Sequence, residues 1–381
     1  MRTSALQRLA IASLVCAAAG SILIAQSPAA VPAVQGSPAT PSSSSTTPSG
    51  SSATPSSSST QAGQDAQVQR PSFADWLAGV KAEALSRGIR TDIVESALGS
   101  VTEPLDVVIE RDRSQAETVL PLETYIARQL TASRIRTGRE MYRRHRTLLE
   151  KIAAHYQVPS RLLVSIWGAE SNFGRFSGVR PTIDALATLA WDPRRSTLFR
   201  GELFNALDIL NRGDIDLAGM RGSWAGAMGQ VQFMPSSYLN FAEDFDGDGR
   251  RDIWSSQADV FASIANYIKG NGWTSGQLWG REVKVSPAAR KRIDAEVGRR
   301  TPSGGCRAAR EMSAILPLAK WNELGVRTTA GRALPAADVN ASLISGATRH
   351  FLAYSNYDVV LAYNCAHAYA LGVTLFSDQI R

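Results

Sequence analysis

A single carboxylate interrupts an otherwise apolar stretch of the chain. Residues 165–178 read SIWGAESNFGRFSG, and Glu170 is the only acid among them. At the C-terminal end of a helix this side chain would face the negative end of the helix dipole, and burial would disfavour its ionised form. Both effects raise a carboxyl pKa, which suits a general acid. The alternative is that Glu170 is solvated or forms a structural ion pair with a base such as Arg175. Structural ion pairs also perturb carboxyl pKa values, so a perturbed pKa would not by itself indicate catalysis.

The residues around Glu170 predict the helix that positions it. Pro159 and Ser160 can begin this helix, since proline is tolerated in a first turn. Asn172 and Gly174 can end it in the left-handed conformation. The apolar residues between these limits recur at spacings that place them on one face with Glu170: Leu162, Leu163, Ile166 and Trp167.

A second stretch, at 222–238, reads GSWAGAMGQVQFMPSSY and is typical of a ligand-binding turn. Gly226 and Gly229 would let the backbone approach a ligand closely. Gln232 offers a hydrogen-bond donor and an acceptor on one side chain. The alternative is a tightly packed turn within a core.

The segment DFDGDGRRDIW carries acids at alternating positions, a pattern that indicates a cation loop. Asp244, Asp246 and Asp248 stand at positions 1, 3 and 5 of an EF-hand-like loop, followed by Gly249 at 6 and Asp252 at 9. Position 12 holds a serine where such loops carry glutamate. We expect a weak structural Ca²⁺ site; the alternative is a turn held by side-chain-to-backbone hydrogen bonds.

The N-terminal part of the chain predicts export. Residues 1–26 have a basic start and a charge-free apolar run, as in a signal peptide, although an uncleaved membrane anchor is the alternative. Cys16 would be the lipidated residue if the chain were a lipoprotein. The residue before it is Val15, however, where a lipoprotein is expected to carry a small residue. Residues 27–71, rich in serine, threonine and proline, predict a disordered linker. In an exported chain Cys306 and Cys365 can form a disulfide or remain two buried thiols.

The remaining residues, 72–381, predict a mainly α protein. Apolar residues recur at helical spacing near residues 73–80 and 148–153, and Tyr357 to Phe376 predicts one long apolar helix. Residues 281–345 have weaker periodicity and predict a loop-rich insertion with one short strand at 281–285.

The formal charge of the 381-residue chain is +7 and is spread along the sequence. This balance favours anionic polymers outside the cytoplasm, but no nucleic-acid-binding motif accompanies it, so we expect no nucleic-acid ligand. Neither the cysteines nor the scattered histidines have the spacing of a zinc site.

Several motifs together resemble the membrane-bound lytic murein transglycosylase B family. They are AESNFGRFSG, SWAGAMGQVQFMPSSY, DFDGDGRRDIW, ASIANYIKGNGW, LPLAKWNELGVR and AYNCAHAYALGV, in this order between residues 72 and 381. The resemblance implies a goose-type-lysozyme-like catalytic core at about 145–280, completed by a C-terminal helix at about 346–381. An added helical lobe and the small loop- and β-containing insertion at about 281–345 would complete the fold.

The resemblance also implies a reaction. Enzymes of this family cut the β-1,4 bond between N-acetylmuramic acid and N-acetylglucosamine in peptidoglycan and leave a 1,6-anhydro ring, with one glutamate as acid and then as base. Glu170 matches that glutamate. Two alternatives stay open: a hydrolytic muramidase using a second carboxylate such as Asp184 or Asp192, and a non-catalytic peptidoglycan-binding protein.

Further site residues follow from motif position. The residues expected to contact substrate are Ser223, Gln232, Tyr267, Tyr363, Asn364 and Tyr369. Here Ala362 and Cys365 flank the Tyr363–Asn364 pair, where the family usually has a basic and a polar residue. The family's cation loop is longer, which adds Asp259 and the backbone carbonyl of Arg250 to the expected Ca²⁺ ligands.

These observations give a working description of the protein. We expect a monomer of the periplasm, with membrane association left open, that acts on glycan strands and needs no cofactor for its chemistry. Proteins of cell-wall synthesis or remodelling are candidate partners.

Overall fold

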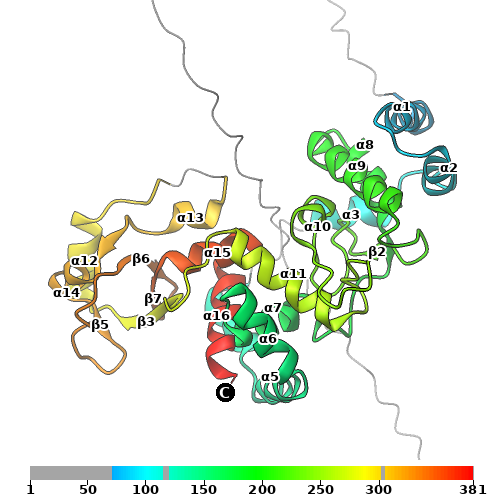
Figure 1. Cartoon of the computed structure of the whole chain (residues 1–381). Helices are drawn as coiled ribbons and strands as arrows, with labels where there is room; N and C mark the ends of the chain where they lie inside the picture. The colour runs from blue at the N-terminus through cyan, green and yellow to red at the C-terminus, as the bar shows by residue number, and fades with distance from the viewer. Residues whose placement is uncertain (1–70, 115–119, 302–304, 381) are drawn as a thin grey trace, which may run out of the picture.

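The computed structural model describes residues 71–114, 120–301 and 305–380. The expected signal peptide at 1–26, including Cys16, and the expected linker at 27–71 apart from Pro71 lie outside these residues. The described part is mainly helical, as the sequence predicts, with sixteen helices and seven short strands. Figure 1 shows three parts in a row: an outer helical lobe, a central group of helices and a lobe built on a sheet.

The outer lobe combines the start of the described chain with a segment from its middle. Its helices are α1 (Phe73–Ser86), α2 (Thr91–Gly99), α3 (Asp106–Ser114), α8 (Thr182–Trp191), α9 (Ser196–Arg212) and α10 (Pro235–Phe241). The Ser72 hydroxyl begins α1 by accepting a hydrogen bond from the Asp75 N–H at 3.1 Å. Helices α1, α2 and α3 pack on α8 and α9. The short strands β1 (Arg180–Pro181) and β2 (Arg221–Gly222) pair at its edge.

The central group surrounds the helix that carries Glu170. It contains α4 (Leu122–Gln129), α5 (Ala132–Arg144), α6 (Arg146–Tyr156), α7 (Ser160–Ser171), α11 (Gln257–Gly270), α15 (Ser355–Tyr363) and α16 (His367–Gln379). Helix α7 starts and ends where the sequence predicts and packs against α5, α6, α11 and α16. Trp167 meets Phe261 of α11 edge-on at 5.1 Å between ring centroids, and the Ser165 hydroxyl donates to the Val373 carbonyl of α16 at 2.5 Å. Contacts on several sides therefore fix α7.

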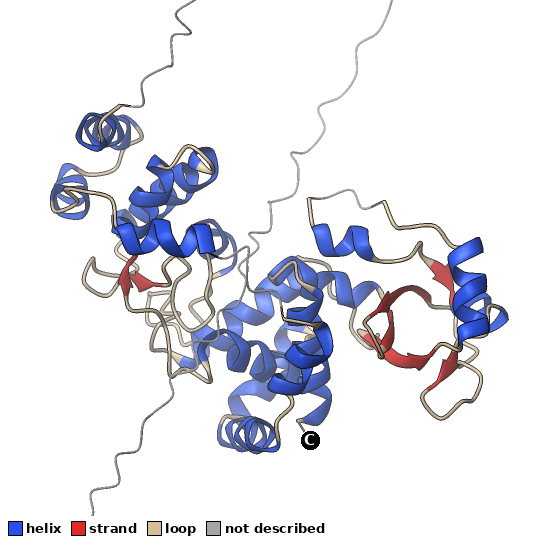
Figure 2. Ribbon diagram, turned by 180° about the vertical axis from the view of Figure 1, so that it is seen from behind, coloured by secondary structure: helices blue, strands red, loops and turns tan. Residues whose placement is uncertain are grey.

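The third part is the predicted insertion, and it holds more sheet than its periodicity indicates. An antiparallel sheet runs in the order β4 (Leu316–Pro317), β6 (Asn340–Ser345), β7 (His350–Ala353), β3 (Gly280–Lys284), β5 (Arg327–Thr328). Figure 2 shows the strands curving beside α12 (Pro287–Glu296), α13 (Arg307–Glu311) and α14 (Leu318–Glu323). Trp321 and Leu352, both fully buried, belong to a hydrophobic core separate from the main one. The expected strand at 281–285 is confirmed as β3.

The C-terminal segment differs from the single helix that its apolar run predicts. The helices α15 and α16 meet at 115°, because residues 364–366 leave the helical conformation: Asn364 has φ −149° and ψ 116°. Cys365, inside this break, forms a disulfide with Cys306, with a Cα–Cα distance of 5.6 Å. Of the two alternatives that the sequence left open, a disulfide or two buried thiols, the structure shows the disulfide. In the described residues no single helix is long and apolar enough to cross a membrane; α15 and α16 meet that criterion only as a bent pair, by length and composition.

Candidate active site

Glu170 lies in the last turn of α7, next to the residue where the helix ends. Asn172 ends α7 in the left-handed conformation, with φ 50°, as predicted. Burial raises the pKa of the Glu170 carboxyl to about 7, whereas the hydrogen bond from Tyr369 lowers it. The side chain nevertheless keeps some exposed surface, and within the described residues it forms no ion pair with Arg175 or any other base. A carboxylic acid that is protonated near neutral pH and still reachable from solvent can donate a proton to a ligand.

Tyr369 of α16 is the direct partner of this carboxyl. Its hydroxyl donates to Glu170 Oε1 at 2.5 Å. Burial raises the pKa of Tyr369 far above its ordinary value, so the phenol keeps its proton at any relevant pH. The bond favours the ionised carboxylate, and it engages Oε1, whereas Oε2 accepts no hydrogen bond from the residues that the structure describes.

Two further tyrosines extend this wall from Tyr369. The Tyr363 ring stacks on that of Tyr369, with centroids 6.4 Å apart and planes at 13°. Tyr267 of α11 meets Tyr363 at 4.8 Å. The Tyr363 hydroxyl donates to the Val231 carbonyl and the Tyr267 hydroxyl to the Ala362 carbonyl, each at 2.7 Å. The break between α15 and α16 thus brings three of the expected tyrosines together beside Glu170.

Asn364, also expected at the site, lies in the break itself. Its side chain is buried, and its Oδ1 has no hydrogen-bond partner in the described part of the chain. A buried amide oxygen without a partner is costly, so this acceptor is suited to a donor from a ligand or a bound water.

Ser223 and Gln232 lie at the two ends of the turn at 222–233. The Ser223 Oγ accepts from the N–H groups of Ala225 at 3.2 Å and Ala227 at 3.1 Å, so its own proton can be donated elsewhere. Gln232 adopts a left-handed backbone, with φ 52°, and donates from Nε2 to the Gly229 carbonyl at 2.9 Å. Both side chains are partly exposed and keep hydrogen-bonding capacity for a ligand.

The two glycines of this turn serve packing rather than close approach to a ligand. Gly226 has φ 84°, and a Cβ there would lie 2.4 Å from Leu186 Cδ2. Gly229 has φ 66°, and a Cβ there would lie 2.7 Å from the Ile253 carbonyl oxygen. At Gly226 and Gly229 the structure therefore shows the alternative, a tightly packed turn within the core.

The structure adds three residues that were not among those expected at the site from the sequence. Burial, and after it the charge of the nearby Glu170, raises the pKa of the Tyr125 phenol on α4. Arg134 of α5 donates to the Gly168 carbonyl at 2.6 Å, which satisfies a carbonyl in the last turn of α7. The buried Gln230 accepts from Trp167 Nε1 and donates to the Trp254 carbonyl, both at 2.7 Å. Gln230 lies within the stretch 222–238, but neither it nor the other two residues stands out by periodicity, because the partners of all three are distant in sequence.

The second carboxylates considered for a hydrolytic reaction have other surroundings. Asp192 lies at the end of α8 and pairs with Arg194 at 2.6 Å. Asp184 lies in the first turn of α8, where burial raises its pKa. Neither aspartate contributes to the pKa of Glu170, which is set by burial and by Tyr369.

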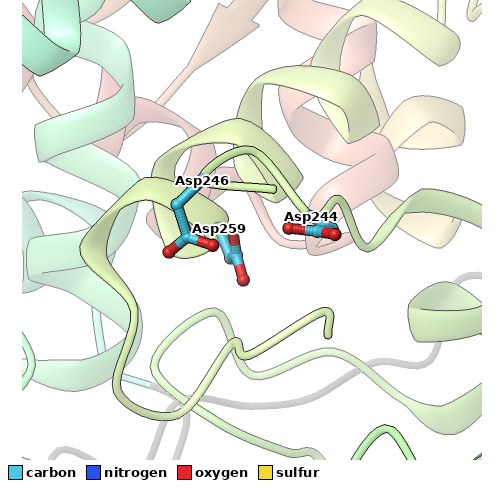
Figure 3. A group of neighbouring side chains, drawn as sticks. All are labelled: Asp244, Asp246 and Asp259. Carbon is cyan, nitrogen blue, oxygen red and sulfur yellow. The ribbon is translucent and has the colours of Figure 1, made fainter. Parts of the chain in front are cut away.

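Three of the expected calcium ligands come together. Carboxylate oxygens of Asp244, Asp246 and Asp259 all lie within 4.8 Å of one another, and Figure 3 shows Asp246 and Asp259 directed into the same space with Asp244 beside them. Asp259 is fully buried and has no ion pair with a base in the described residues. Converging carboxylates, one of them buried without a basic partner, fit a hard cation such as Ca²⁺.

The other expected ligands lie in the same loop but outside this group of three, and carboxylates inside and outside the group alike accept hydrogen bonds from backbone N–H groups. Asp248 Oδ1 accepts from the Arg250 N–H at 2.8 Å, and the Arg250 side chain is exposed. Asp252 Oδ1 accepts from the N–H groups of Trp254 at 2.9 Å and Ser255 at 2.8 Å. Their role as ligands therefore stays a prediction.

The chain is similar to known proteins in both sequence and structure. Residues 72–378 match the family described as the transglycosylase SLT domain. The chain belongs to this family. It is 39% identical over 153 residues to membrane-bound lytic murein transglycosylase B of Escherichia coli (strain K12), an alignment that covers 40% of this chain and 42% of that relative.

Two solved structures of this transglycosylase group share the fold. SltB3 from Pseudomonas aeruginosa, in complex with NAG-NAM-pentapeptide, has a TM-score of 0.72 and 37% identity, covering 81% of this chain and 79% of that one. The Escherichia coli lytic transglycosylase Slt35, in complex with calcium, has a TM-score of 0.65 and 25% identity, covering 82% of this chain and 93% of that one. The expected mainly α, lysozyme-like architecture is confirmed.

Proposed function

We propose that this chain is a lytic murein transglycosylase that cleaves the β-1,4 bond between N-acetylmuramic acid and N-acetylglucosamine and leaves 1,6-anhydromuramic ends. The observation that carries the proposal is the Glu170 carboxyl. Its pKa is about 7, and within the described residues its side chain accepts a hydrogen bond from one group, the neutral phenol of Tyr369. Family membership and the names of the similar proteins support the same activity.

In the first half of the reaction Glu170 acts as an acid. Protonated near neutral pH, it gives its proton to the glycosidic oxygen as the bond to the muramic C1 breaks. Positive charge develops at C1, and the substrate's own N-acetyl carbonyl is placed to stabilise it. The Tyr369 hydroxyl stabilises the carboxylate that Glu170 becomes, because the bond favours the ionised form.

In the second half the same carboxylate acts as a base. It takes the proton of the muramic 6-hydroxyl, and that oxygen bonds to C1 to close the anhydro ring. An intramolecular hydroxyl has a very high effective concentration, so no positioned water or second carboxylate is needed. This explains how one acid suffices where most glycosidases use two.

The expected substrate contacts follow from the geometry of the site. We propose that the Ser223 hydroxyl, the Gln232 amide and the buried Asn364 Oδ1 bind sugar substituents around the cleaved bond. The rings of Tyr267, Tyr363 and Tyr369 would form the wall behind the sugar.

We also propose that Asp244, Asp246 and Asp259, with the Arg250 carbonyl, Asp248 and Asp252 as further ligands, hold a structural Ca²⁺. The ion would brace the loop between α10 and α11 and take no part in the chemistry. The calcium complex of Slt35 supports this choice of metal.

The place of action is proposed on the same basis. Peptidoglycan lies outside the cytoplasm, so the expected signal peptide, periplasmic location and linker fit this activity. The relative from Escherichia coli is named as membrane-bound. The boundaries of the lysozyme-like core and of the insertion, a monomeric state and protein partners in cell-wall remodelling remain predictions.

The test is a digest of purified sacculi by the wild-type chain and by Glu170→Gln, analysed by mass spectrometry. We expect anhydro-ended fragments from the wild type and a loss of at least about 10³-fold in Glu170→Gln, because that amide can neither donate nor return the proton. The melting temperature of the variant should not fall. Reducing-ended fragments would indicate the hydrolase instead, and binding without fragments would indicate the non-catalytic alternative.

A further inference from the structure

Arg134 of α5 is a half-buried cation that lies against the end of α7. It forms no ion pair within the described residues, and its buried Nε has no hydrogen-bond partner among them. A cation removed from water without a carboxylate partner is costly, so other contacts must offset that cost. The contacts that Arg134 does make connect two helices of the candidate active site.

These contacts come from the end of α7 and from α16. Arg134 Nη2 donates to the carbonyl of Gly168, two residues before Glu170, at 2.6 Å. The guanidinium carbon lies 5.7 Å from the centre of the Phe173 ring and 5.5 Å from that of the Phe376 ring, both within the range of a cation–π interaction. Phe173 follows the end of α7 and Phe376 belongs to α16, so one side chain holds the two elements together.

The surroundings of the two rings leave them little room to move. Phe173 has a left-handed backbone, with φ 60°, and a Cβ at Gly168 would lie 2.5 Å from Phe173 Cε1. A Cβ at Gly138 of α5 would lie 2.7 Å from Phe376 Cζ. The centroids of the two rings are 6.2 Å apart. Because both rings are packed this closely, the guanidinium that contacts them is held in one place.

The same two helices carry the acid and the hydroxyl that balances it. Tyr369 lies seven residues before Phe376, on the same face of α16, and lines a small pocket together with Arg134. The hydrogen bond from Tyr369 to Glu170 measures 2.5 Å, and a hydrogen bond weakens steeply when its distance or angle changes. A shift of α16 against α7 would therefore weaken this bond.

We propose that Arg134 is a positioning residue: it holds the end of α7 against α16 so that the Tyr369 hydroxyl meets the Glu170 carboxylate. Its effect on catalysis rests on the proposed function, whereas the positioning itself does not involve the substrate. No hydrogen bond or ion pair joins Arg134 to Glu170 in the described part of the chain, so its influence passes through Tyr369. Removing Arg134 should act like removing the Tyr369 bond, and should have no further effect where that bond is already absent.

The groups around Glu170 make this effect measurable. The side chains whose pKa the Glu170 charge raises are four phenols, on α4, α11, α15 and α16: Tyr125, Tyr267, Tyr363 and Tyr369. Burial raises their pKa values further, so all four stay neutral while Glu170 titrates. Helix α6, which also packs on α7, contributes no described group to the pKa of Glu170. A shifted titration therefore reflects either the Tyr369 bond or the Arg134 charge itself, and a double-mutant cycle separates the two.

The test titrates Glu170 directly by NMR, in the full chain labelled with carbon-13 at the glutamate carboxyl carbons; Glu170→Gln identifies the signal. The Tyr369 bond lowers the pKa of Glu170, so its loss in Arg134→Met should raise the titration midpoint by about one pH unit. In a Tyr369→Phe background the same change should produce no further shift. Arg134→Lys keeps the charge and a donor for the Gly168 carbonyl, and should titrate close to the wild type.

A matched control and a second variant accompany Arg134→Met. The control is Arg281→Met, because the half-buried Arg281 lies 5.6 Å from the Tyr354 ring in the sheet lobe and bonds its hydroxyl. It should leave the titration of Glu170 unchanged. Phe376→Leu keeps the bond from Arg134 to α7 but weakens the contact with α16, so it should shift the midpoint in the same direction by less.

An unshifted midpoint in Arg134→Met, or an equal shift in the Tyr369→Phe background, would overturn the inference. If Arg134→Met does not fold, Phe376→Leu decides by the same two criteria. In sacculus digests Arg134→Met should lower kcat about tenfold and leave KM unchanged, because the contact acts on the proton and not on substrate binding. The titration needs no substrate: a chain that releases no anhydro ends but shows the Arg134-dependent shift would refute the proposed function and leave the inference standing.

Discussion

At the scale of single residues, the Glu170–Tyr369 pair governs the proton. Burial alone would keep the acid protonated well into the neutral range, which suits donation but not return. The Tyr369 hydroxyl opposes burial by stabilising the carboxylate, so the pKa settles at about 7, where neither form is strongly favoured. A group that must act first as acid and then as base works best with such a balanced pKa.

Tyr369→Phe should move the pH profile of the enzyme. Because the lost bond lowers the pKa of Glu170, its removal raises that pKa above about 7. The alkaline limb of kcat/KM, along which protonated Glu170 is lost, should move up by about one pH unit, since a bond to a charged group contributes about 1.5 kcal/mol. The maximal rate should fall because the carboxylate is less stabilised. Release of anhydro-ended fragments between pH 5 and 9 measures both.

Tyr357→Phe is the control for this experiment. It removes a hydroxyl that is equally buried but bonds to His367 Nδ1, at 3.0 Å, rather than to Glu170. Its profile should match that of the wild type. If Tyr369→Phe did the same, Tyr369 would have no influence on the proton of Glu170.

At the scale of elements, the turn at 222–233 shows how packing sets a loop. Gly226 combines a left-handed backbone with direct contact against Leu186, so its conformation and its lack of a side chain are both required. Gly213, which ends α9 with φ 80°, has the same kind of backbone but open space around it. Comparing substitutions at Gly213 and Gly226 therefore distinguishes the cost of backbone strain alone from the added cost of overpacking.

Gly213→Ala should cost about 1 kcal/mol of unfolding free energy, from the left-handed backbone alone. Gly226→Ala should cost about 2–5 kcal/mol, because a methyl group in contact with Leu186 adds overpacking to the same strain. Urea unfolding of both variants measures the difference. Equal losses would mean that the turn can shift to accept the methyl group.

Some helices and strands could be predicted from the sequence, and others could not. The limits of α7 and the place of Glu170 within it followed from a local apolar pattern and end signals, and the structure confirms them. The break between α15 and α16 has no such signal, because its apolar run is continuous and the disulfide to Cys306 depends on a distant segment. Strands β4 and β5 are two residues long, too short for alternation to appear. Tyr125, 45 positions before Glu170, likewise became visible only once the chain was folded.

At the scale of the whole molecule, one disulfide joins the sheet lobe to the break between α15 and α16, beside the site tyrosines. Cys306 belongs to the segment before α13, and Cys365 follows Tyr363 and Asn364 directly. The bond closes a loop of 59 residues that contains most of the sheet. It therefore restrains both the docking of the sheet lobe and the break that shapes the tyrosine wall.

Cys306→Ala with Cys365→Ala should lower the unfolding free energy by about 2–4 kcal/mol, because the unfolded chain regains the freedom that the closed loop removes. Calorimetry with and without a reductant measures the effect: the reductant should lower the melting temperature of the wild type and leave that of the variant unchanged. A wild type that resists the reductant and melts like the variant would show that the bond contributes nothing.

The proposed Ca²⁺ would affect the whole molecule, because the loop that holds it connects the outer lobe to α11. Added Ca²⁺ should raise the melting temperature, and EDTA should reverse the rise, because an ion that binds only the folded chain stabilises it by mass action. Asp259→Asn should abolish the response. A melting curve indifferent to both treatments in the wild type would remove the metal from the description.

The hydrogen bond between Tyr369 and Glu170 joins two residues that are synthesised at different times. The two partners are separated by 199 positions along the chain. The acid is therefore translated before the hydroxyl that balances it, and the bond between them forms only once α16 has docked against α7. A nascent polypeptide that does not yet include Tyr369 consequently holds an acid without its balancing hydroxyl, and the proposed cleavage activity would be acquired only once α16 has docked.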